Sequence, residues 1–294
     1  MNFEASETPR AVIVVSSHVA RGSVGNRAMV FALETLGHPV WAVPTVILPW
    51  HPGHGRATRI VPEPGQFAAL MKDLENAPWL GEVAGVISGY LGDSTQAGAV
   101  ASLVEAVKAK NPQALYVCDP VMGDQGGLYV ATAVAEAMRD LLMPIADIAT
   151  PNRYELEWLS GMKLDDMRST IAAASQAGPA TMLVTSAPAM IAGGVGNLLL
   201  TASDALLVEH RTIERPPNGL GDLTAAVFLA RLLGGQPIAK ALQSTTAAVY
   251  EILARTAKRG GDELQLETDA QSLSHPMAMV QLRHLLHPGK DRRA

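Results

Sequence analysis

The sequence predicts an α/β protein, a three-layer α/β/α sandwich with one central, mainly parallel sheet. Two observations support this fold class. Short apolar runs alternate along the chain with longer segments whose apolar residues recur at helical spacing. The first run, residues 11–15, is apolar throughout and almost entirely β-branched. Such a run is typical of a strand that is buried on both faces of a parallel sheet.

The remaining elements follow from the same alternation. We expect strands over residues 11–15, 40–48, 83–88, 114–118, 145–149 and 181–185, and β-like runs over 198–201 and 205–208. We expect helices over residues 26–36, 97–109, 131–142, 152–160, 222–233, 238–259 and 276–286. Gly37 stands where the first helix should end, because glycine accepts the left-handed conformation common after a helix.

The chain is expected to form a single domain over residues 1–294, because no segment is long or biased enough to act as a linker. Residues 49–64 differ from the rest in being rich in Pro, Gly and His. This composition indicates a loop or lid over the substrate site at the edge of the sheet. The last residues, 288–294, are expected to be a disordered tail.

Composition limits the classes of function. The formal net charge of -5 and the pI of about 5.9 argue against a nucleic-acid partner, whose surface needs a basic stripe. No apolar run approaches the roughly 20 residues of a membrane span, so no membrane partner is expected. The polar start of the chain is unlike a signal peptide. The single cysteine, Cys118, cannot form an internal disulfide, which favours a reducing, cytoplasmic location.

Polar residues follow many of the predicted strands. In an open parallel sheet, ligands bind outside the carboxyl ends of the strands. The residues at these positions are Ser16-Ser17, Ser88-Gly89-Tyr90, Asp119-Pro120, Thr150-Pro151-Asn152 and Thr185-Ser186. Together they predict a polar site above an apolar sheet.

The segment 216–222 joins prolines and glycines to an apolar helix and ends in Asp222. A helix start leaves backbone N–H groups without partners. Gly219 and Gly221 would let a phosphate approach those groups closely, where they could stabilise a transferring phosphoryl group. Asp222 could take the proton from an attacking hydroxyl. Alternatively, Asp222 is a simple N-cap and the glycines form a turn.

Three more carboxylates are candidate ligands of Mg²⁺. Asp119 and Asp124 bracket the end of a strand, where an acidic pair can hold this ion through water. Asp119 could equally stabilise an Asp-Pro turn. Glu155 falls about one turn into a helix for which Thr150 is the expected cap. It could be a metal-side carboxylate or a capping glutamate.

The loop after the first strand, residues 16–27, offers a small hydroxyl, Ser17, for a polar contact to substrate. The alternative is an ordinary loop between a strand and a helix. Its glycines do not form the Gly-x-Gly-x-x-Gly fingerprint of a dinucleotide site.

Taken in order, these segments resemble the pyridoxal kinase family of the ribokinase superfamily, and most of all its bacterial pyridoxal and pyridoxamine kinases. The likeness spans nearly the whole chain. It is carried by Ser17-His18-Val19, Gly25-Asn26-Arg27, Ser88-Gly89-Tyr90, Cys118-Asp119-Pro120-Val121-Met122-Gly123, Thr150-Pro151-Asn152 with Glu155, and Gly219-Leu220-Gly221-Asp222. Ala247-Ala248-Val249-Tyr250-Glu251 and Glu263-Leu264-Gln265-Leu266 add to it.

The resemblance implies ATP-dependent phosphorylation of the 5′-hydroxyl of pyridoxal, pyridoxamine or pyridoxine in vitamin B6 salvage. It also implies Mg²⁺, possible use of K⁺, and a homodimer. The implied base is Asp222, within an anion hole of Gly219, Leu220, Gly221 and Asp222. Ser17, Tyr90 and Asp222 would bind the vitamer, and Asp119, Asp124 and Glu155 the metal. The implied ATP contacts are Asp119, Thr150, Asn152, Glu155, Thr185, Ser186, Gly219 and Gly221.

The chain departs from the family pattern at two places. Leu220 stands where many relatives have Thr or Val, so a hydroxyl contact to phosphate is absent. Pro52 stands where relatives usually have a Thr that reaches the substrate. In the same loop, Trp50 could stack on a ring. His51 and His54 could be read as a metal pair or, more plainly, as loop histidines.

Two alternatives stay open from the sequence. Hydroxymethylpyrimidine kinases share the fold and the Asp base, although Ser17-His18-Val19 argues against them. The other alternative is a vitamer-binding protein without turnover. Pro52 and Leu220 motivate it, whereas Asp222, Asp119 and Glu155 argue for catalysis.

Overall fold

A nine-stranded sheet forms the centre of the computed structural model, which describes residues 10–287. Its strands are β1 (Ala11–Val19), β2 (Val40–Leu48), β3 (Val83–Ser88), β4 (Leu115–Cys118), β7 (Ile148–Ala149), β8 (Thr181–Pro188), β9 (Gly194–Leu200), β10 (Ala205–Arg211) and β11 (Gln281–Leu285). The strand order is β11-β10-β9-β8-β7-β4-β3-β1-β2. A separate two-stranded sheet pairs β5 (Gly123–Asp124) with β6 (Gly127–Leu128).

In this strand order, every pair from β8 across to β2 is parallel. At the other end, β9, β10 and β11 extend the sheet from β8 with antiparallel pairs. The predicted mainly parallel sheet is therefore confirmed. Its parallel strands end at one edge, which is where polar residues were expected to gather.

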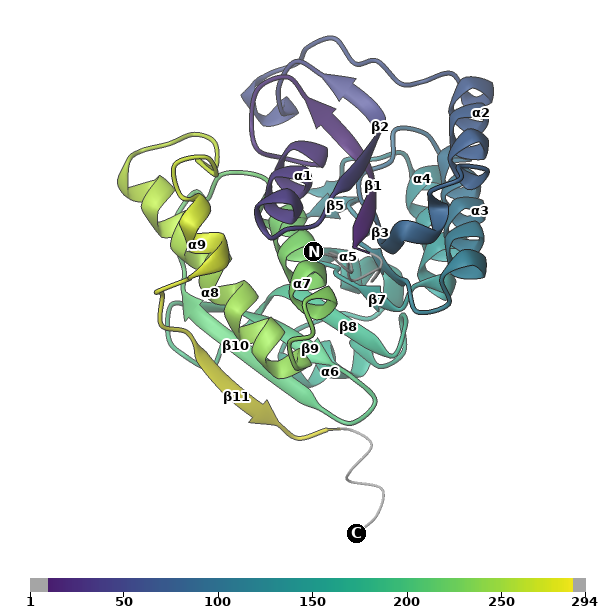
Figure 1. The fold of residues 1–294 in the computed structure, drawn as a ribbon. Helices are drawn as coiled ribbons and strands as arrows, with labels where there is room; N and C mark the ends of the chain where they lie inside the picture. The colour runs from purple at the N-terminus through teal and green to yellow at the C-terminus, as the bar shows by residue number, and fades with distance from the viewer. Residues whose placement is uncertain (1–9, 288–294) are drawn as a thin grey trace, which may run out of the picture.

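Helices cover both faces of the sheet (Figure 1). One face carries α1 (Asn26–Thr35), α7 (Leu220–Leu233), α8 (Ile238–Lys258) and the short α9 (Ala270–Ser274). The other carries α2 (Pro64–Glu75), α3 (Thr95–Lys110), α4 (Thr132–Ala137) with the π-helical η3 (Met138–Leu142), α5 (Arg153–Ser160) and α6 (Met167–Ala174). Three single-turn 3₁₀ helices, η1 (Pro52–His54), η2 (Leu80–Glu82) and η4 (Met143–Ile145), lie in connections.

Strand β1 shows why the apolar runs required two helical layers. Its side chains alternate between two cores: Val12 and Val14 pack under α1 and α7, whereas Ile13 and Val15 pack under the opposite helices. All four are fully buried. Burial of each aliphatic side chain contributes about 1.5–3 kcal/mol, so both layers stabilise the sheet.

One predicted element has the wrong type. Residues 276–286 were expected to be helical, but β11 forms there and pairs antiparallel with β10. In Figure 1 β11 (yellow) lies along β10 at the sheet edge opposite β2. The open hydrogen-bonding edge of β10 provides the partner that makes this segment a strand, and a local pattern does not reveal that partner.

Several boundaries also differ from expectation. Helix α2 begins at Pro64, with Glu63 as its capping residue, so the expected 49–64 loop ends at Glu63. Helices α2, α6 and α9 were not predicted. Strands β1 and β8 extend further than expected and include Ser17 and Ser186. The expected tail, 288–294, lies outside the described residues. Within residues 10–287, no helix combines the length and apolar character needed to cross a membrane.

Candidate active site

Asp222 lies in the first turn of α7, not at its N-cap. The helix begins at Leu220, and the N-cap is Gly219, which has a left-handed φ of 94°. The carboxylate of Asp222 accepts a hydrogen bond of 2.9 Å from the backbone N–H of Gly25. The N-cap interpretation is therefore wrong. Burial raises the pKa of Asp222 to about 6, although the Gly25 N–H favours the charged form.

The loop before α1 packs tightly on the start of α7. A Cβ at Gly219 would lie 2.1 Å from the carbonyl oxygen of Ser23, and a Cβ at Gly25 would lie 2.3 Å from Oγ of Ser17. Glycine is required at both positions, because no side chain fits and both have positive φ. Gly221 differs: a Cβ there would meet no described atom within 4 Å. The open side of the turn is therefore at Gly221.

A second carboxylate lies at the end of β4. Asp119 Oδ1 accepts a hydrogen bond of 2.8 Å from the Thr150 hydroxyl at the end of β7. Within the described residues, the buried Oδ2 of Asp119 has no hydrogen-bond partner. Burial, and then the charge of Asp222, raise the pKa of Asp119 to about 8. Such a group would be stabilised by a cation.

Glu155 caps the start of α5. It accepts the Asn152 N–H at 2.8 Å while Asn152 Oδ1 accepts the Glu155 N–H at 2.9 Å, a reciprocal capping box. Its other oxygen accepts the Met122 N–H at 3.0 Å. The capping interpretation of Glu155 is confirmed, and the cap of α5 is Asn152, not Thr150. Burial and the charge of Asp119 hold the pKa of Glu155 well above its ordinary value.

The β5–β6 hairpin places two further groups near these acids. Asp124 is exposed, and its carboxylate accepts the Gly126 N–H at 2.8 Å. Partial burial, followed by the charges of Glu155 and Asp119, raises the pKa of the Tyr129 phenol. Sequence reasoning missed Tyr129. Its available signal was the Gly126-Gly127 turn after Asp124, which returns the chain toward the site.

The donor set fits Mg²⁺. In the part of the chain that the structure describes, no three His, Cys, Asp or Glu side chains are grouped to hold a metal. Mg²⁺, however, is commonly held by one or two carboxylates together with water and substrate phosphates. The unpartnered, buried oxygen of Asp119 is the atom that such an ion would satisfy, with Glu155 next to it.

Ser17 and Tyr90 lie at the ends of neighbouring strands, β1 and β3. Ser17 is buried. The position of Tyr90 is fixed by two hydrogen bonds of its backbone. The Tyr90 N–H donates to Ser16 Oγ at 3.2 Å, and its carbonyl accepts from Thr45 Oγ1 at 2.6 Å. Arg59 Nη2 lies 3.5 Å from the Tyr90 hydroxyl. Thr45 and Arg59 were not predicted, because their partner is distant in sequence.

The loop from residue 49 to 63 reaches the turn before α7. A Cβ at Gly53 would lie 3.3 Å from Nδ2 of Asn218. His51 Nδ1 accepts the Gly53 N–H, whereas His54 Nε2 lies 2.7 Å from Glu263 Oε1. The two histidines thus have different partners, and neither belongs to a described metal group. The Trp50 indole donates to a backbone carbonyl within the loop.

Thr185 and Ser186 lie beside the end of β7. The Thr185 N–H donates to the carbonyl of Pro151 at 2.9 Å, and Asn152 forms a parallel bridge with Thr185. Ser186 is exposed with a left-handed φ of 53°, at an irregularity in the pairing of β8 with β9. The structure therefore brings Thr150, Asn152, Thr185 and Ser186 to one edge of the sheet.

The fold and the site define a small-molecule kinase with the ribokinase-like fold. Its marks are the glycine turn at α7 and the two carboxylates, Asp119 and Asp222, at the carboxyl edge of the parallel strands. Comparison with known proteins agrees. The family model described as phosphomethylpyrimidine kinase matches residues 70–267. The pyridoxal kinase PdxY of Rubrobacter xylanophilus is 38% identical over 93% of this chain and 97% of its own length. The chain belongs to the pyridoxal kinase family.

Other relatives support the same assignment. The pyridoxal kinase PdxY of Corynebacterium diphtheriae is 34% identical over 93% of this chain and 99% of its own. The structure of pyridoxal kinase from Leishmania donovani in complex with ADP and pyridoxine is 29% identical, with a TM-score of 0.86. It aligns over 94% of this chain and 99% of that one. The predicted fold class and family are confirmed.

Proposed function

We propose that this protein transfers the γ-phosphoryl group of ATP to the 5′-hydroxyl of pyridoxal, with pyridoxamine and pyridoxine as further acceptors, in vitamin B6 salvage. One observation carries the mechanism: the Asp222 carboxylate is held by Gly25 at the open start of α7. The names of the relatives, and the complex of the Leishmania enzyme with ADP and pyridoxine, support the acceptor and the nucleotide.

Asp222 is the proposed general base. Its raised pKa of about 6 leaves it ionised at neutral pH and able to accept the proton of the acceptor hydroxyl. The Gly25 N–H binds one carboxylate oxygen and so orients the other for proton transfer. Ser17 lies against Gly25, and this position supports its hydroxyl as a contact to the vitamer.

The first backbone N–H groups of α7 are the proposed anion hole. The groups from Gly219 to Asp222 precede the repeating hydrogen bonds of the helix and point toward its open end. They would stabilise the negative charge on the transferring phosphoryl group. Because the backbone supplies these donors, Leu220 needs no hydroxyl.

The nucleotide and metal sites complete the proposal. Thr150, Asn152, Thr185 and Ser186 would line the nucleotide site at their shared edge of the sheet. Asp119 and Glu155 would hold Mg²⁺, with Asp124 at the margin, and the ion would offset the charge of the phosphates. A requirement for K⁺ and a homodimeric state are proposed on the family likeness alone. A single kinase domain is proposed because no segment has the composition of a linker, and a cytoplasmic location because the chain has one cysteine.

ATP consumption with pyridoxal, pyridoxamine, pyridoxine and hydroxymethylpyrimidine tests the function. We expect turnover with at least one B6 vitamer in Mg²⁺ and K⁺. Preference for hydroxymethylpyrimidine would favour the other kinase of this fold. Vitamer binding without turnover would favour a non-catalytic binding protein.

A further inference from the structure

The loop between α8 and α9 carries a buried carboxylate, Glu263, whose side chain is only 10% exposed. Two segments distant in sequence bind it. The backbone N–H of Ser23 donates to Glu263 Oε2 at 3.3 Å, and His54 Nε2 lies 2.7 Å from Oε1. Arg21 Nη1 lies 3.8 Å from the same Oε1. Glu263 therefore joins the loop over residues 49–63, called the lid below, to the loop before α1.

The loop before α1 is shaped around this carboxylate. A Cβ at Gly22 would lie 2.6 Å from Glu263 Oε1, so any other residue would displace the carboxylate from its present position. Gly22 also has a positive φ of 113°. Next to it, the Ser23 hydroxyl donates to the carbonyl of Leu264 at 2.7 Å. The Glu263-Leu264 pair thus binds both the backbone and the side chain of Ser23.

From Ser23 the contacts continue to the base. The carbonyl of Ser23 faces Gly219 so closely that no side chain fits between them. Gly25, two residues later, donates its N–H to Asp222. On the other side, His54 is in the same loop as Gly53, which lies against Asn218. Glu263 is therefore linked to the α7 turn through both segments.

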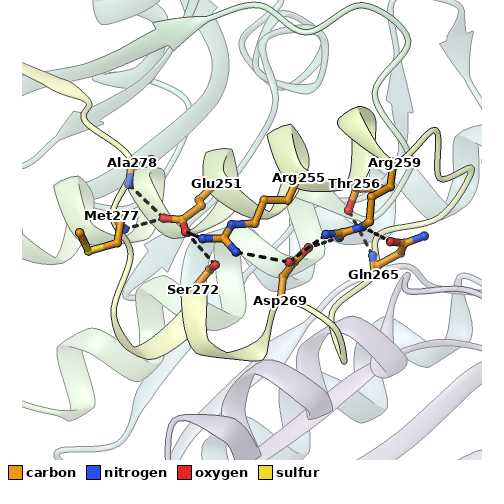
Figure 2. Close-up of polar contacts among 9 residues, drawn as sticks. All are labelled: Glu251, Arg255, Thr256, Arg259, Gln265, Asp269, Ser272, Met277 and Ala278. Carbon is orange, nitrogen blue, oxygen red and sulfur yellow. Dashed lines mark hydrogen bonds and ion pairs between the residues drawn. The ribbon is translucent and has the colours of Figure 1, made fainter.

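An ionic cluster holds the loop that presents Glu263. Figure 2 shows Arg255 and Arg259 of α8 turned toward Asp269, whose side chain is 1% exposed. Arg259 also donates to the side chain of Gln265, while the Gln265 N–H donates to Thr256 Oγ1 at 3.3 Å. The loop is thus tied to α8 through Asp269 and Gln265.

Glu251, one turn before Arg255, extends the cluster toward the C-terminal segment. It accepts hydrogen bonds from the Arg255 guanidinium and the Ser272 hydroxyl, and from the backbone N–H groups of Met277 and Ala278 (Figure 2). Helix α8, which precedes the loop of residues 259–269, is therefore bound to the segment that follows the loop. A carboxylate on such a support can hold more mobile partners in place.

We propose that Glu263 is a positioning residue that fixes the lid, through His54, and the Ser23–Gly25 segment in one arrangement around Asp222. It touches neither reactant. Its effect is to keep the acceptor side of the site assembled, so that vitamer binding does not first have to order the lid. The inference deepens the proposed kinase function and rests on it.

The test compares Glu263→Ala with Asp262→Ala. Asp262 is the adjacent carboxylate and is exposed. It binds Arg21 at 2.8 Å and acts on His54 through its charge rather than through a hydrogen bond. We expect Glu263→Ala to raise the vitamer KM about 10-fold, near 1.4 kcal/mol, with a smaller change in the KM for ATP. Amide exchange in residues 49–59 should become faster. Asp262→Ala should leave both unchanged.

Two further variants separate positioning from folding. His54→Ala removes only the lid contact, so it should raise the vitamer KM while the Gly25 and Asp222 contact stays intact. Glu263→Gln keeps an acceptor for the Ser23 N–H and should reverse most of the rise in vitamer KM seen in Glu263→Ala. Circular dichroism and thermal unfolding establish that each variant is folded.

Unchanged exchange in residues 49–59 and an unchanged vitamer KM in folded Glu263→Ala would overturn the proposal. Equal effects of Asp262→Ala would overturn it as well. The exchange measurement needs no turnover, so it tests the link between Glu263 and the lid even if the wild-type protein proves inactive. That inactivity would count against the proposed function instead.

Discussion

Asp222 and Gly25 are joined by a 2.9 Å hydrogen bond across 197 positions of sequence, with the Gly25 N–H donating to the carboxylate. Asp222 therefore accepts a hydrogen bond from a distant loop, whereas a capping carboxylate would accept one from the first N–H groups of its own helix. The bond also joins the loop before α1 to the start of α7. The orientation of Asp222, the proposed base, therefore depends on two segments together.

Replacing Asp222 with Asn should abolish most turnover but preserve the fold. The amide oxygen can still accept the Gly25 N–H, whereas it cannot take a proton from the acceptor. We expect kcat to fall by about 10²-fold or more, the scale of general-base catalysis, with nucleotide binding near normal by calorimetry. Asp73→Asn, on the exposed side of α2, is the control. Turnover unchanged in Asp222→Asn would remove its assigned role.

The pH dependence of kcat/KM for the vitamer should report the ionisation of Asp222. Burial raises the pKa of this group to about 6, and a base works only when ionised. Activity should therefore fall, with a slope of one, as the pH drops below about 6. Initial rates across the acid range measure this limb. A profile that stays flat down to the ordinary pKa of an aspartate would contradict the assignment.

Asp119→Asn should stabilise the ligand-free protein while reducing activity. The pKa of Asp119 is raised from 3.8 to about 8, so between these pH values the folded state keeps a proton that the unfolded state releases, and the free energy of unfolding falls as the pH rises. Asn has no ionisable group at this position and can still accept the Thr150 hydroxyl. We expect the unfolding midpoint at neutral pH to rise by roughly 2–4 °C per kcal/mol gained.

This gain should disappear in acid, where Asp119 of the wild type is protonated in the unfolded state as well as in the folded state. Thermal unfolding at acidic and neutral pH, without ligand, measures the difference. Mg²⁺ with nucleotide should then stabilise the wild type more than the variant, because the variant has lost a metal-side carboxylate. Equal stabilisation of both proteins would argue against Asp119 as a metal-side group.

The glycines of the α7 turn should respond differently to alanine. In Gly219→Ala the new Cβ would collide with the Ser23 carbonyl, and the alanine would have to adopt a left-handed backbone conformation. We expect a loss of stability of about 1–3 kcal/mol in denaturant unfolding. In Gly221→Ala the Cβ meets no described atom and the residue is helical, so stability should be unchanged or about 0.4–1 kcal/mol higher.

Catalysis should nevertheless suffer in Gly221→Ala. The Cβ would stand on the open side of the turn, where the phosphoryl group has to approach the backbone N–H groups. We expect a stable protein with a lower kcat, measured as ATP consumption with saturating vitamer. Full activity in Gly221→Ala would place the phosphoryl group elsewhere.

Local sequence patterns determined much of the fold. Strands β2 and β3 match the predicted ranges 40–48 and 83–88 to the residue. The α/β alternation, the glycine turn before α7 and the polar strand ends were likewise visible in the sequence. These features depend on residues close together in the chain: apolar runs form strands, and glycine and proline interrupt them.

Only the tertiary structure decided which distant groups meet. Pairing with the edge of β10 made residues 281–285 a strand. Asp222 binds the N–H of Gly25 instead of capping its own helix. Glu263 acquired its two partners in the same way. In each case the partner lies many residues away, so no local pattern contains it. Polar groups removed from water must find a partner wherever the packed chain places one, and that packing set the geometry of the site.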